Sequence, residues 1–507
     1  MIREKGFDTQ RYLKTQVARI LERVDQFDKL YLEFGGKLRY DHHASRVLPG
    51  FELDTKVQML RKLDELEMVH CISAKDIEGR KIRRDFGLTY EDQILKDIGD
   101  LGELGLDVSA VVINRYSGEQ AAHKFKQRLE NRGIKVYIHY EIEEYLTDLD
   151  RVVSDEGYGK PEHVDTEKRI VVVTAPGPGS GKMSFAMSQV YQDRKMGLMS
   201  GFAKFETFPI WNLPLGHPVN IAYEAATADL GDYNCVDPWH LEAYGVEATN
   251  YNRDVENFAI MLKIIEKMTE PDDPLAEIRS PTDMGVNMAK QGIVDDQVVR
   301  QASREEIVRR YYQYQREFVE GHTTYNTLER MDVVMGKVDV KPSDRAVATA
   351  ANEAWELARE DPSKGFNGLY SGSAIELYMN SGNVIITGKR SPLLHPESAA
   401  LLNAVKTLAG IPDEINVLSP VIIEALNSLK KSMGLSDGLL DVKEVLDALS
   451  VSSVFNPNAA ECLSVLPLLK GCEMHSTHLM DSGCERPLKQ LGFNITTDAR
   501  LHIQNNR

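Results

Sequence analysis

Apolar residues in the first half of the chain alternate between helical spacing and short continuous runs. Over residues 8–28 the apolar positions recur with the period of one helix face. Further helices are predicted over 53–66 and 117–132. Short apolar runs predict buried strands at 29–34, 68–73, 109–114, 134–140 and 169–175. Strands that alternate with helices in this way predict a mostly parallel sheet with helices on both faces.

The pattern changes at about residue 250 and again at about 340. Long helical stretches occupy the region between them. From Pro342-Ser343 onward the expected order is a helix to about Glu360, a hairpin around 380–382, a helix from His395 to Gly410, a strand at 415–418, three helices, a strand, a short helix and a last strand. This order predicts a three-layer α/β/α arrangement. We therefore expect an N-terminal α/β domain over 1–249, a helical domain over 250–340 and a C-terminal α/β/α domain over 341–507.

Composition and charge limit the classes of function. The 507 residues include 60 Lys and Arg against 77 Asp and Glu, a net charge of −17. This acidity argues against a general nucleic-acid or anionic-membrane binder, because both require a positive surface. The five cysteines are too few for a disulfide framework, the N-terminus lacks the apolar core of a signal peptide, and no apolar run reaches about 18 residues. We expect a cytoplasmic protein with reduced thiols, and homo-oligomer formation is left open.

The sharpest local signal is the segment VVVTAPGPGSGKMS over 171–184, where a strand runs into a glycine-rich turn and a helical stretch. In nucleotide-binding loops, the turn amides, the positive end of the following helix and a lysine together form an anion site. Lys182 occupies the position of that lysine here. The match to that loop is imperfect, because Pro176 replaces its first glycine and Met183 its magnesium-binding hydroxyl. The alternative is a structural turn whose glycines permit close packing. The candidate phosphate-binding residues are Gly177, Gly179, Ser180, Gly181, Lys182 and Ser184.

A second candidate site follows the loop. Lys204 and Glu206 stand two residues apart on a predicted strand, and therefore on one face of it. Such a pair suits general acid–base catalysis, so we take both as candidate catalytic residues; the alternative is a surface ion pair. Asp237 precedes Pro238 and is predicted to cap a helix rather than to bind magnesium.

Basic residues also follow the predicted strands. Because ligands bind at the carboxyl ends of strands in doubly wound sheets, these residues are additional candidates for an anion pocket, although solvated loops would show the same pattern. The candidates are Gly36, Lys37, His42, Arg46 and Lys75.

Metal-ligating residue types occur without a standard spacing. Cys472, His475 and His478 would alternate between the two faces of a strand, so one strand cannot bring all three together. His395-Pro396-Glu397 opens a helix after a hairpin and resembles the H-x-E motif of the cytidine-deaminase-like fold. The partner motif of that fold has no thiol after residue 418. We therefore expect none of these residues to ligate a metal and, in particular, no zinc.

Several longer motifs carry a resemblance to a known family. YLEFGGKL, DHHASRVLPGFE, VVVTAPGPGSGKM, KFETFPIWNLPL, NYNRDVE, SPTDMGVNMA and GCEMHST are similar to a bacterial family of unknown function. Its members are sometimes labelled ATP-dependent zinc proteases. The resemblance spans nearly the whole chain. It implies an N-terminal α/β part, a helical part and a C-terminal part that resembles the deaminase fold, and it implies no established activity.

The leading hypothesis is a protein that binds a nucleotide or a phosphorylated metabolite at the 176–182 turn. The cofactor is left open, and the candidate is ATP or another phosphate ligand with Mg²⁺. A non-catalytic ligand-binding or scaffold protein is the first alternative. A metal-dependent hydrolase or deaminase centred on His395 and Glu397 is the second. The expected partner is a phosphorylated small molecule, and neither nucleic acid nor membrane is expected.

Overall fold

The computed structural model describes residues 4–83, 87–142, 147–360, 369–379, 382–434 and 438–500. The chain divides into two compact units. We call residues 5–227 with 232–303 the N-terminal unit, and residues 304–507 with 1–4 and 228–231 the C-terminal unit. None of the helices among the described residues has the length and apolar composition needed to cross a bilayer.

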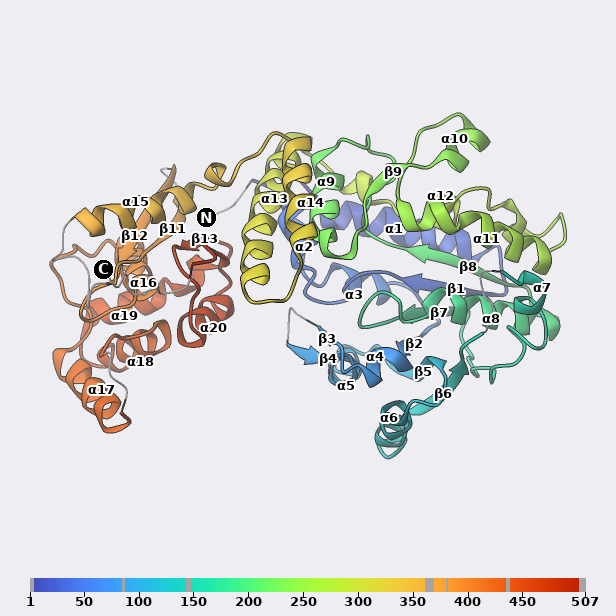
Figure 1. Cartoon of the computed structure of the whole chain (residues 1–507), viewed down its shortest axis with the longest axis horizontal. Helices are drawn as coiled ribbons and strands as arrows, with labels where there is room; N and C mark the ends of the chain where they lie inside the picture. The colour runs from blue at the N-terminus through green and yellow to red at the C-terminus, as the bar shows by residue number, and fades with distance from the viewer. Residues whose placement is uncertain are drawn as a thin grey trace. The chain divides into compact units, whose positions relative to one another are not determined.

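A six-stranded sheet in which all neighbouring strands run parallel organises the N-terminal unit, as the sequence predicts. The strand order is β6-β5-β2-β7-β1-β8, which can be followed from bottom to top in Figure 1. From β2 the chain adds β5 and β6 toward one edge of the sheet, whereas from β7 it continues to β8 at the other edge. The connections that follow the neighbouring strands β2 and β7 therefore lead in opposite directions, and such a switch point is where these sheets bind ligands. The strands are β1 (Lys29–Phe34), β2 (Leu66–Ser73), β5 (Val108–Tyr116), β6 (Lys135–Tyr140), β7 (Ile170–Thr174) and β8 (Ser200–Phe205).

The central strands of this sheet are covered on both faces. Every residue of β7 and β8 is buried, as expected for a parallel sheet between two layers of helices. The helices of this unit are α1 (Thr9–Val24), α2 (His42–Val47), α3 (Thr55–Leu60), α4 (Ala74–Glu78), α5 (Tyr90–Gly102), α6 (Gln120–Glu130), α7 (Leu149–Val152), α8 (Lys182–Lys195), α9 (Pro218–Ala226), α10 (Pro238–Tyr244), α11 (Asn252–Met268) and α12 (Pro281–Met284). Two short ladders, β3 (Ile82–Arg83) with β4 (Leu88–Thr89) and β9 (Asn234–Val236) with β10 (Thr249–Tyr251), complete it.

The helical stretches expected after residue 250 are present. They form α11, α13 (Asp296–Val319) and α14 (Tyr325–Lys337). Phe258, Met261 and Ile264 of α11 belong to the hydrophobic core of the parallel sheet. The boundary between the two compact units falls within α13, after Ser303. The division into three domains at 249 and 340 remains a prediction.

A four-stranded mixed sheet organises the C-terminal unit, in the order β12-β11-β13-β14. β11 pairs antiparallel with β12 and β13, whereas β13 and β14 are parallel. The elements are α15 (Ala346–Glu360), β11 (Gly372–Met379), β12 (Gly382–Lys389), α16 (Pro396–Ala409), α17 (Pro420–Ser432), α18 (Val442–Ser452), α19 (Pro457–Ser464), β13 (Glu473–Ser476), α20 (Ser482–Gln490) and β14 (Asn494–Thr497).

Two glycines show that helices cover opposite faces of the β11–β12 hairpin. A Cβ on Gly372 would lie 2.4 Å from the Ala351 carbonyl oxygen in α15. A Cβ on Gly388 would lie 2.2 Å from the Ala400 amide in α16. Gly388 pairs with Ser373, the neighbour of Gly372, so the two glycines face opposite sides of the sheet. The hairpin therefore lies between two helix layers, and the likeness to the deaminase fold remains a prediction.

Two local predictions for this unit are wrong. Residues 415–418 form no strand, although Val417 and Leu418 are buried. A short apolar run also occurs where a loop crosses a core, and periodicity alone does not separate the two cases. The helix expected to start at Pro342-Ser343 is preceded by a 3-10 turn, Pro342–Asp344, and α15 begins at Ala346. The predicted hairpin is confirmed by the pairing of β11 with β12, while Asn380 and Ser381 lie outside the described residues.

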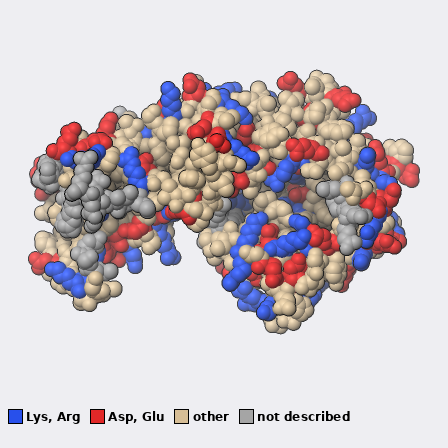
Figure 2. All heavy atoms as spheres, viewed as in Figure 1, with Lys and Arg blue, Asp and Glu red and all other residues tan. Residues whose placement is uncertain are grey.

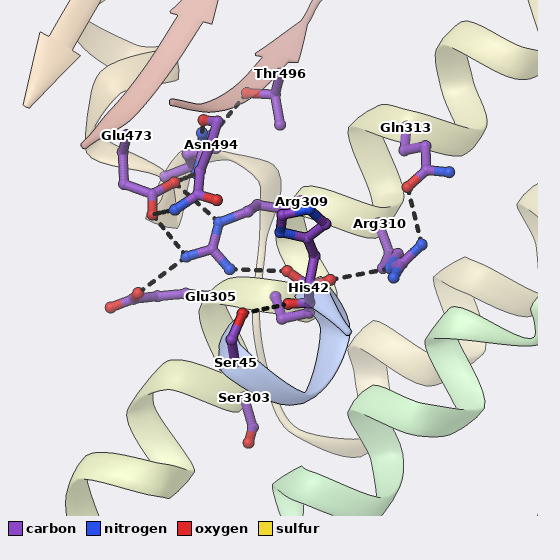
Figure 3. Close-up of polar contacts among 12 residues, drawn as sticks. His42, Ser45, Ser303, Glu305, Arg309, Arg310, Gln313, Glu473, Asn494 and Thr496 are labelled. Atoms are coloured by element: carbon purple, nitrogen blue, oxygen red, sulfur yellow. Dashed lines mark hydrogen bonds and ion pairs between the residues drawn. The ribbon is translucent and has the colours of Figure 1, made fainter. Parts of the chain in front are cut away.

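A buried ion network joins α13 to the sheet within the C-terminal unit (Figure 3). The carboxylate of Glu473 in β13 accepts two hydrogen bonds of 2.9 Å from Arg309 and one of 2.8 Å from Arg345. Arg309 also donates to Glu306, one turn earlier in α13. Because these groups are almost fully buried, the network ties α13 closely to β13.

This network predicts where the C-terminal unit can be cut. A fragment of residues 304–507 should melt cooperatively at a higher temperature than a fragment of residues 341–507. The shorter fragment lacks Arg309, so Glu473 keeps only one of its two buried cationic partners. Thermal denaturation followed by circular dichroism measures the difference. Equal melting temperatures would show that α13 adds nothing to the stability of this unit.

Candidate functional site

The glycine-rich turn lies between β7 and α8, as the sequence predicts. Gly179 and Gly181 have φ angles of 77° and 81°, which side chains other than glycine rarely adopt. Helix α8 starts at Lys182 and has no side-chain cap. Its first amides therefore point from the helix end without a side-chain acceptor, which is the arrangement that binds anions in other proteins.

The same turn is also closely packed. A Cβ on Gly177 would lie 2.1 Å from the Tyr90 hydroxyl oxygen, and one on Gly181 would lie 2.9 Å from Asn114. The Asn114 amide donates to the Ser180 carbonyl at 2.9 Å, and the Ser180 hydroxyl donates to the Gly177 carbonyl at 2.8 Å. These contacts support the structural interpretation of Gly177, Ser180 and Gly181, and they hold the turn in one conformation.

A cavity of about 290 Å³ opens beside this turn in the N-terminal unit. Lys182 lies at the start of α8, whereas Lys204 and Glu206 lie at the carboxyl end of β8 and just after it. The cavity therefore brings together the two separate candidate sites of the sequence. Its polar lining is formed by Glu33, Gly179, Lys182, Lys204, Glu206, Tyr251, Arg253, Asp254 and Asn257, and its apolar lining by Pro178, Met183, Phe258, Ile260, Met261, Ile264 and Met284.

Lys204, Tyr251, Glu206 and Asp254 form a connected network in this cavity. The ammonium of Lys204 donates to Asp254 Oδ2 and to the Tyr251 hydroxyl oxygen, both at 2.5 Å. The Tyr251 hydroxyl lies 2.9 and 3.0 Å from the two carboxylate oxygens of Glu206. Lys204 Nζ is 3.4 Å from Glu206 Oε2. The side chain of Lys204 is 8% exposed and that of Glu206 24%, so this pair is largely enclosed and has further partners, unlike the surface ion pair that the sequence left open.

Burial shifts the proton affinities in this network. It raises the pKa of Glu206 to about 7, although the charge of Lys204 acts in the opposite direction. Burial by itself would lower the pKa of Lys204, but Asp254 and Glu206 outweigh it and hold that pKa well above its usual value. Burial, together with Glu206, raises the pKa of Tyr251. The pKa of Glu206 thus lies near neutral pH, which makes Glu206 a candidate for proton transfer.

Lys182 has a partner on the neighbouring strand. Its ammonium lies 3.5 Å from Glu33 Oε1 near the end of β1. Glu33 is 6% exposed, and its other carboxylate oxygen has no hydrogen-bond partner among the described residues. Lys182 thus balances a buried carboxylate and faces the cavity at the same time.

A second, much smaller cavity lies on another side of the charged network. Its volume is about 40 Å³, and it shares Lys204, Glu206 and Asp254 with the larger cavity. Asn250 and Thr249 also line it. Phe208, Pro209 and Trp211 line it as well, so polar and apolar groups share this space.

The other candidates for an anion pocket, which follow the strand ends, do not line either of these two cavities. They are Gly36, Lys37, His42, Arg46 and Lys75. Lys75 pairs with Glu141 at 2.6 Å in an exposed position. Gly36 has a φ of 72°, and a Cβ there would lie 3.1 Å from the Lys56 ammonium, so the turn itself requires glycine. A role of these residues in binding an anion remains a prediction.

Sequence reasoning missed Glu33, Tyr251 and Asp254, the three unpredicted residues that pair with Lys182, Lys204 or Glu206. Glu33 stands within the apolar run KLYLEF, and a charged residue inside a buried strand is a signal that the sequence does show. Tyr251 and Asp254 belong to the motif NYNRDVE, which carried the family resemblance without a role. Asp237 was assigned correctly, because it caps α10 and accepts hydrogen bonds from the amides of Trp239 and His240.

The fold and the cavity define an α/β protein with a candidate anion site at the carboxyl edge of a parallel sheet. Two consecutive family matches cover the chain: the N-terminal domain of unknown function DUF1846 over residues 5–339 and its C-terminal counterpart over 343–506. The chain belongs to the DUF1846 family.

Similar proteins are known from bacteria. A UPF0371 protein of Clostridium tetani (strain Massachusetts / E88) is 47% identical over 495 residues, 97% of each chain. A UPF0371 protein of Clostridioides difficile (strain 630) is 47% identical over 502 residues, 99% of each chain. These matches confirm the family of unknown function that the motifs resemble.

On the face shown in Figure 2, acidic and basic side chains are interspersed over the described surface, in a chain whose net charge is −17.

Proposed function

We propose that this protein binds a small phosphorylated metabolite in the cavity beside the glycine-rich turn, and that Glu206 transfers a proton to or from it. The observation that carries the proposal is that one cavity is lined both by Gly179 and Lys182 and by Lys204 and Glu206. An anion-binding turn and a proton-transfer group thus face the same space, which is the usual arrangement of an active site.

The anionic group is proposed to lie at the start of α8. Lys182 supplies a full positive charge there, and the helix end supplies a partial one. The Lys182–Glu33 pair is loose at 3.5 Å, so the ammonium can contact a ligand oxygen without leaving Glu33. The remainder of the ligand would lie against the apolar side chains of α11 that line the cavity.

The size of the cavity favours a ligand smaller than ATP. Pockets that enclose drug-sized ligands span about 300–1,000 Å³. The cavity, at about 290 Å³, lies at the lower limit of that range. A phosphorylated sugar or a similar metabolite suits it better than a nucleoside triphosphate. ATP with Mg²⁺ therefore belongs in the test as a separate arm.

Binding is tested on the full-length protein with a panel of sugar phosphates and nucleoside mono-, di- and triphosphates, each with and without Mg²⁺. A ligand that binds only the folded state raises the melting temperature. Calorimetry on the best compound should then show that Lys182→Met weakens binding by about 10–100-fold, the worth of a hydrogen bond to a charged group. If no phosphorylated compound raises the melting temperature, the proposal fails.

Two variants separate binding from stability. Lys182→Met leaves Glu33 buried without its cation, so the double variant Glu33→Gln/Lys182→Met should regain stability and still bind weakly. Lys195→Met is the matched control, because Lys195 ends the same helix and its side chain is 51% exposed. Unchanged affinity in the double variant would contradict a role of Lys182 in the site. Binding without any conversion of the ligand would favour the non-catalytic alternative.

A further inference from the structure

Three side chains that ligate metals meet in the C-terminal unit. His395 precedes α16, whereas Asp481 and Cys484 lie at the start of α20. One ligand atom from each residue lies within 4.8 Å of the other two. Among the described residues, this is the one group of three or more His, Cys, Asp or Glu side chains with such spacing. It involves none of the residues of the phosphate site.

Local backbone structure holds the three residues in place. Asp481 is the N-cap of α20, and its Oδ1 accepts the amide hydrogen of Cys484 at 2.8 Å. The capping turn therefore places carboxylate and thiol on the first turn of one helix. The amide of His395 donates to the Leu440 carbonyl oxygen at 3.2 Å. His395 Nδ1 is then 4.0 Å from Asp481 Oδ2.

The burial of the three residues is graded. Cys484 is 1% exposed, the His395 side chain 12% and the Asp481 side chain 52%. The thiol and the imidazole thus form the inner part of the cluster, and the carboxylate faces solvent. Three protein ligands with access to water on one side are typical of metal sites that keep a coordination position open.

A fourth side chain points to a ligand at the same place. Glu397 follows His395 by two residues and is fully buried. Its Oε1 accepts a short hydrogen bond from the Ser476 hydroxyl, but its Oε2 has no partner among the described residues. Its carboxylate is close enough to His395, Asp481 and Cys484 to act on them electrostatically. Burying a carboxylate oxygen without a hydrogen-bond partner costs free energy. A water molecule bound to a metal ion would donate the missing hydrogen bond.

We propose that His395, Asp481 and Cys484 bind one Zn²⁺ ion, with a water molecule in the remaining position and Glu397 as the acceptor of its hydrogen bond. Thiolate and imidazole ligands select zinc over magnesium or calcium, which prefer oxygen ligands alone. The ligand atoms all lie within 4.8 Å of one another, and small side-chain movements toward a shared ion would complete the site. This proposal is independent of the proposed phosphate site.

The sequence argument against zinc considered His395 but sought its partner ligands at other positions. It looked for a thiol after residue 418 and for ligands along one strand at 472–478. In the structure, His475 hydrogen-bonds with Thr496, and His478 hydrogen-bonds with Ser476. The thiol that meets His395 comes instead from Cys484 in α20, across a tertiary contact that spacing along the chain does not reveal.

The test uses the full-length protein with its affinity tag removed. Elemental analysis of the purified protein should find about one zinc per chain. After removal by a chelator, one equivalent of Co²⁺ should bind, and its thiolate charge-transfer absorption should report the Cys484 contact. Zinc should displace the cobalt. Absence of both zinc in the purified protein and stoichiometric cobalt binding after chelation would overturn the proposal.

Variants assign the ligands. Cys484→Ser should abolish the charge-transfer absorption. His395→Gln and Asp481→Asn should each lower the affinity for Co²⁺. The decrease should exceed the roughly 10–100-fold that is lost when a residue hydrogen-bonded to a metal ligand is removed. Cys472→Ser is the matched control, because Cys472 is equally buried in the same unit but outside the cluster. Glu397→Gln should retain the metal. A charge-transfer absorption that survives Cys484→Ser, or that disappears in Cys472→Ser, would show that the site lies elsewhere. His395→Gln decides the outcome if Cys484→Ser does not fold.

Discussion

Replacing Glu473 by Gln should lower the free energy of unfolding of the C-terminal unit by about 3–5 kcal/mol, the cost of breaking a buried ion pair by removing one partner. The carboxylate of Glu473 receives hydrogen bonds of 2.8–2.9 Å from Arg309 and Arg345. Both guanidinium side chains are at most 5% exposed. Glutamine keeps the shape but removes the charge, so two buried cations lose their shared counter-ion.

Chemical denaturation followed by circular dichroism measures this loss. Glu356→Gln is the control, because Glu356 pairs with Arg359 on the surface of α15 and its side chain is 56% exposed. An exposed pair of this kind contributes about 0–1 kcal/mol. The double variant Arg309→Met/Glu473→Gln should be more stable than Glu473→Gln alone, because the guanidinium of Arg309, which retains Glu306, no longer lies buried against an uncharged glutamine. A loss no larger than that of the control would show that the network does not hold α13 to the sheet.

Replacing Glu206 by Gln should stabilise the N-terminal unit at pH 8 by on the order of 3 kcal/mol and leave its stability nearly unchanged near pH 4. Burial raises the pKa of Glu206 from 4.5 to about 7 in the folded protein. Between these two values the folded state binds more protons than the unfolded state. The contribution of Glu206 to the free energy of unfolding therefore falls as the pH rises from 4.5 to about 7. Above about pH 7, the full cost of burying the charged carboxylate is present.

The difference in unfolding free energy between the wild type and the Glu206→Gln variant, measured from pH 4 to pH 8, isolates this contribution. Glu256→Gln serves as the control, because Glu256 is exposed on α11. Its difference from the wild type should stay constant over the same range. A constant difference for Glu206→Gln as well would contradict a raised pKa, and with it the role of Glu206 in proton transfer at neutral pH.

Much of the N-terminal fold could be predicted from local patterns. The predicted strands at 29–34, 68–73, 109–114, 134–140 and 169–175 agree with the observed strands to within two residues at either end. Continuous apolar runs identify strands that are buried on both faces, because a parallel sheet is covered on both sides. The run at 415–418 is the counterexample, because there the same apolar composition lies in an irregular segment against a core.

The candidate site was predicted only in part. Lys182, Lys204 and Glu206 were found because each follows a strand or a glycine-rich turn, and local sequence shows such positions. Glu33 and Asp254 were missed because nothing near them in the sequence indicates what they face. Burial, which decides the raised pKa of Glu206, is likewise a property of the surroundings and not of the residue type.

The sequence by itself determined the buried strands, the glycine-rich turn and the residue types that carry chemistry, because these depend on side-chain period and on backbone conformation within a few residues. Only the tertiary structure decided which of these residues meet. The strand order places β1 between β7 and β8, so Glu33, Lys182 and Lys204 come together although they are 22 to 171 residues apart in the sequence. The docking of α20 beside the start of α16 likewise brings Cys484 to His395. Such contacts depend on how whole elements bury their apolar faces against one another, which local spacing does not encode.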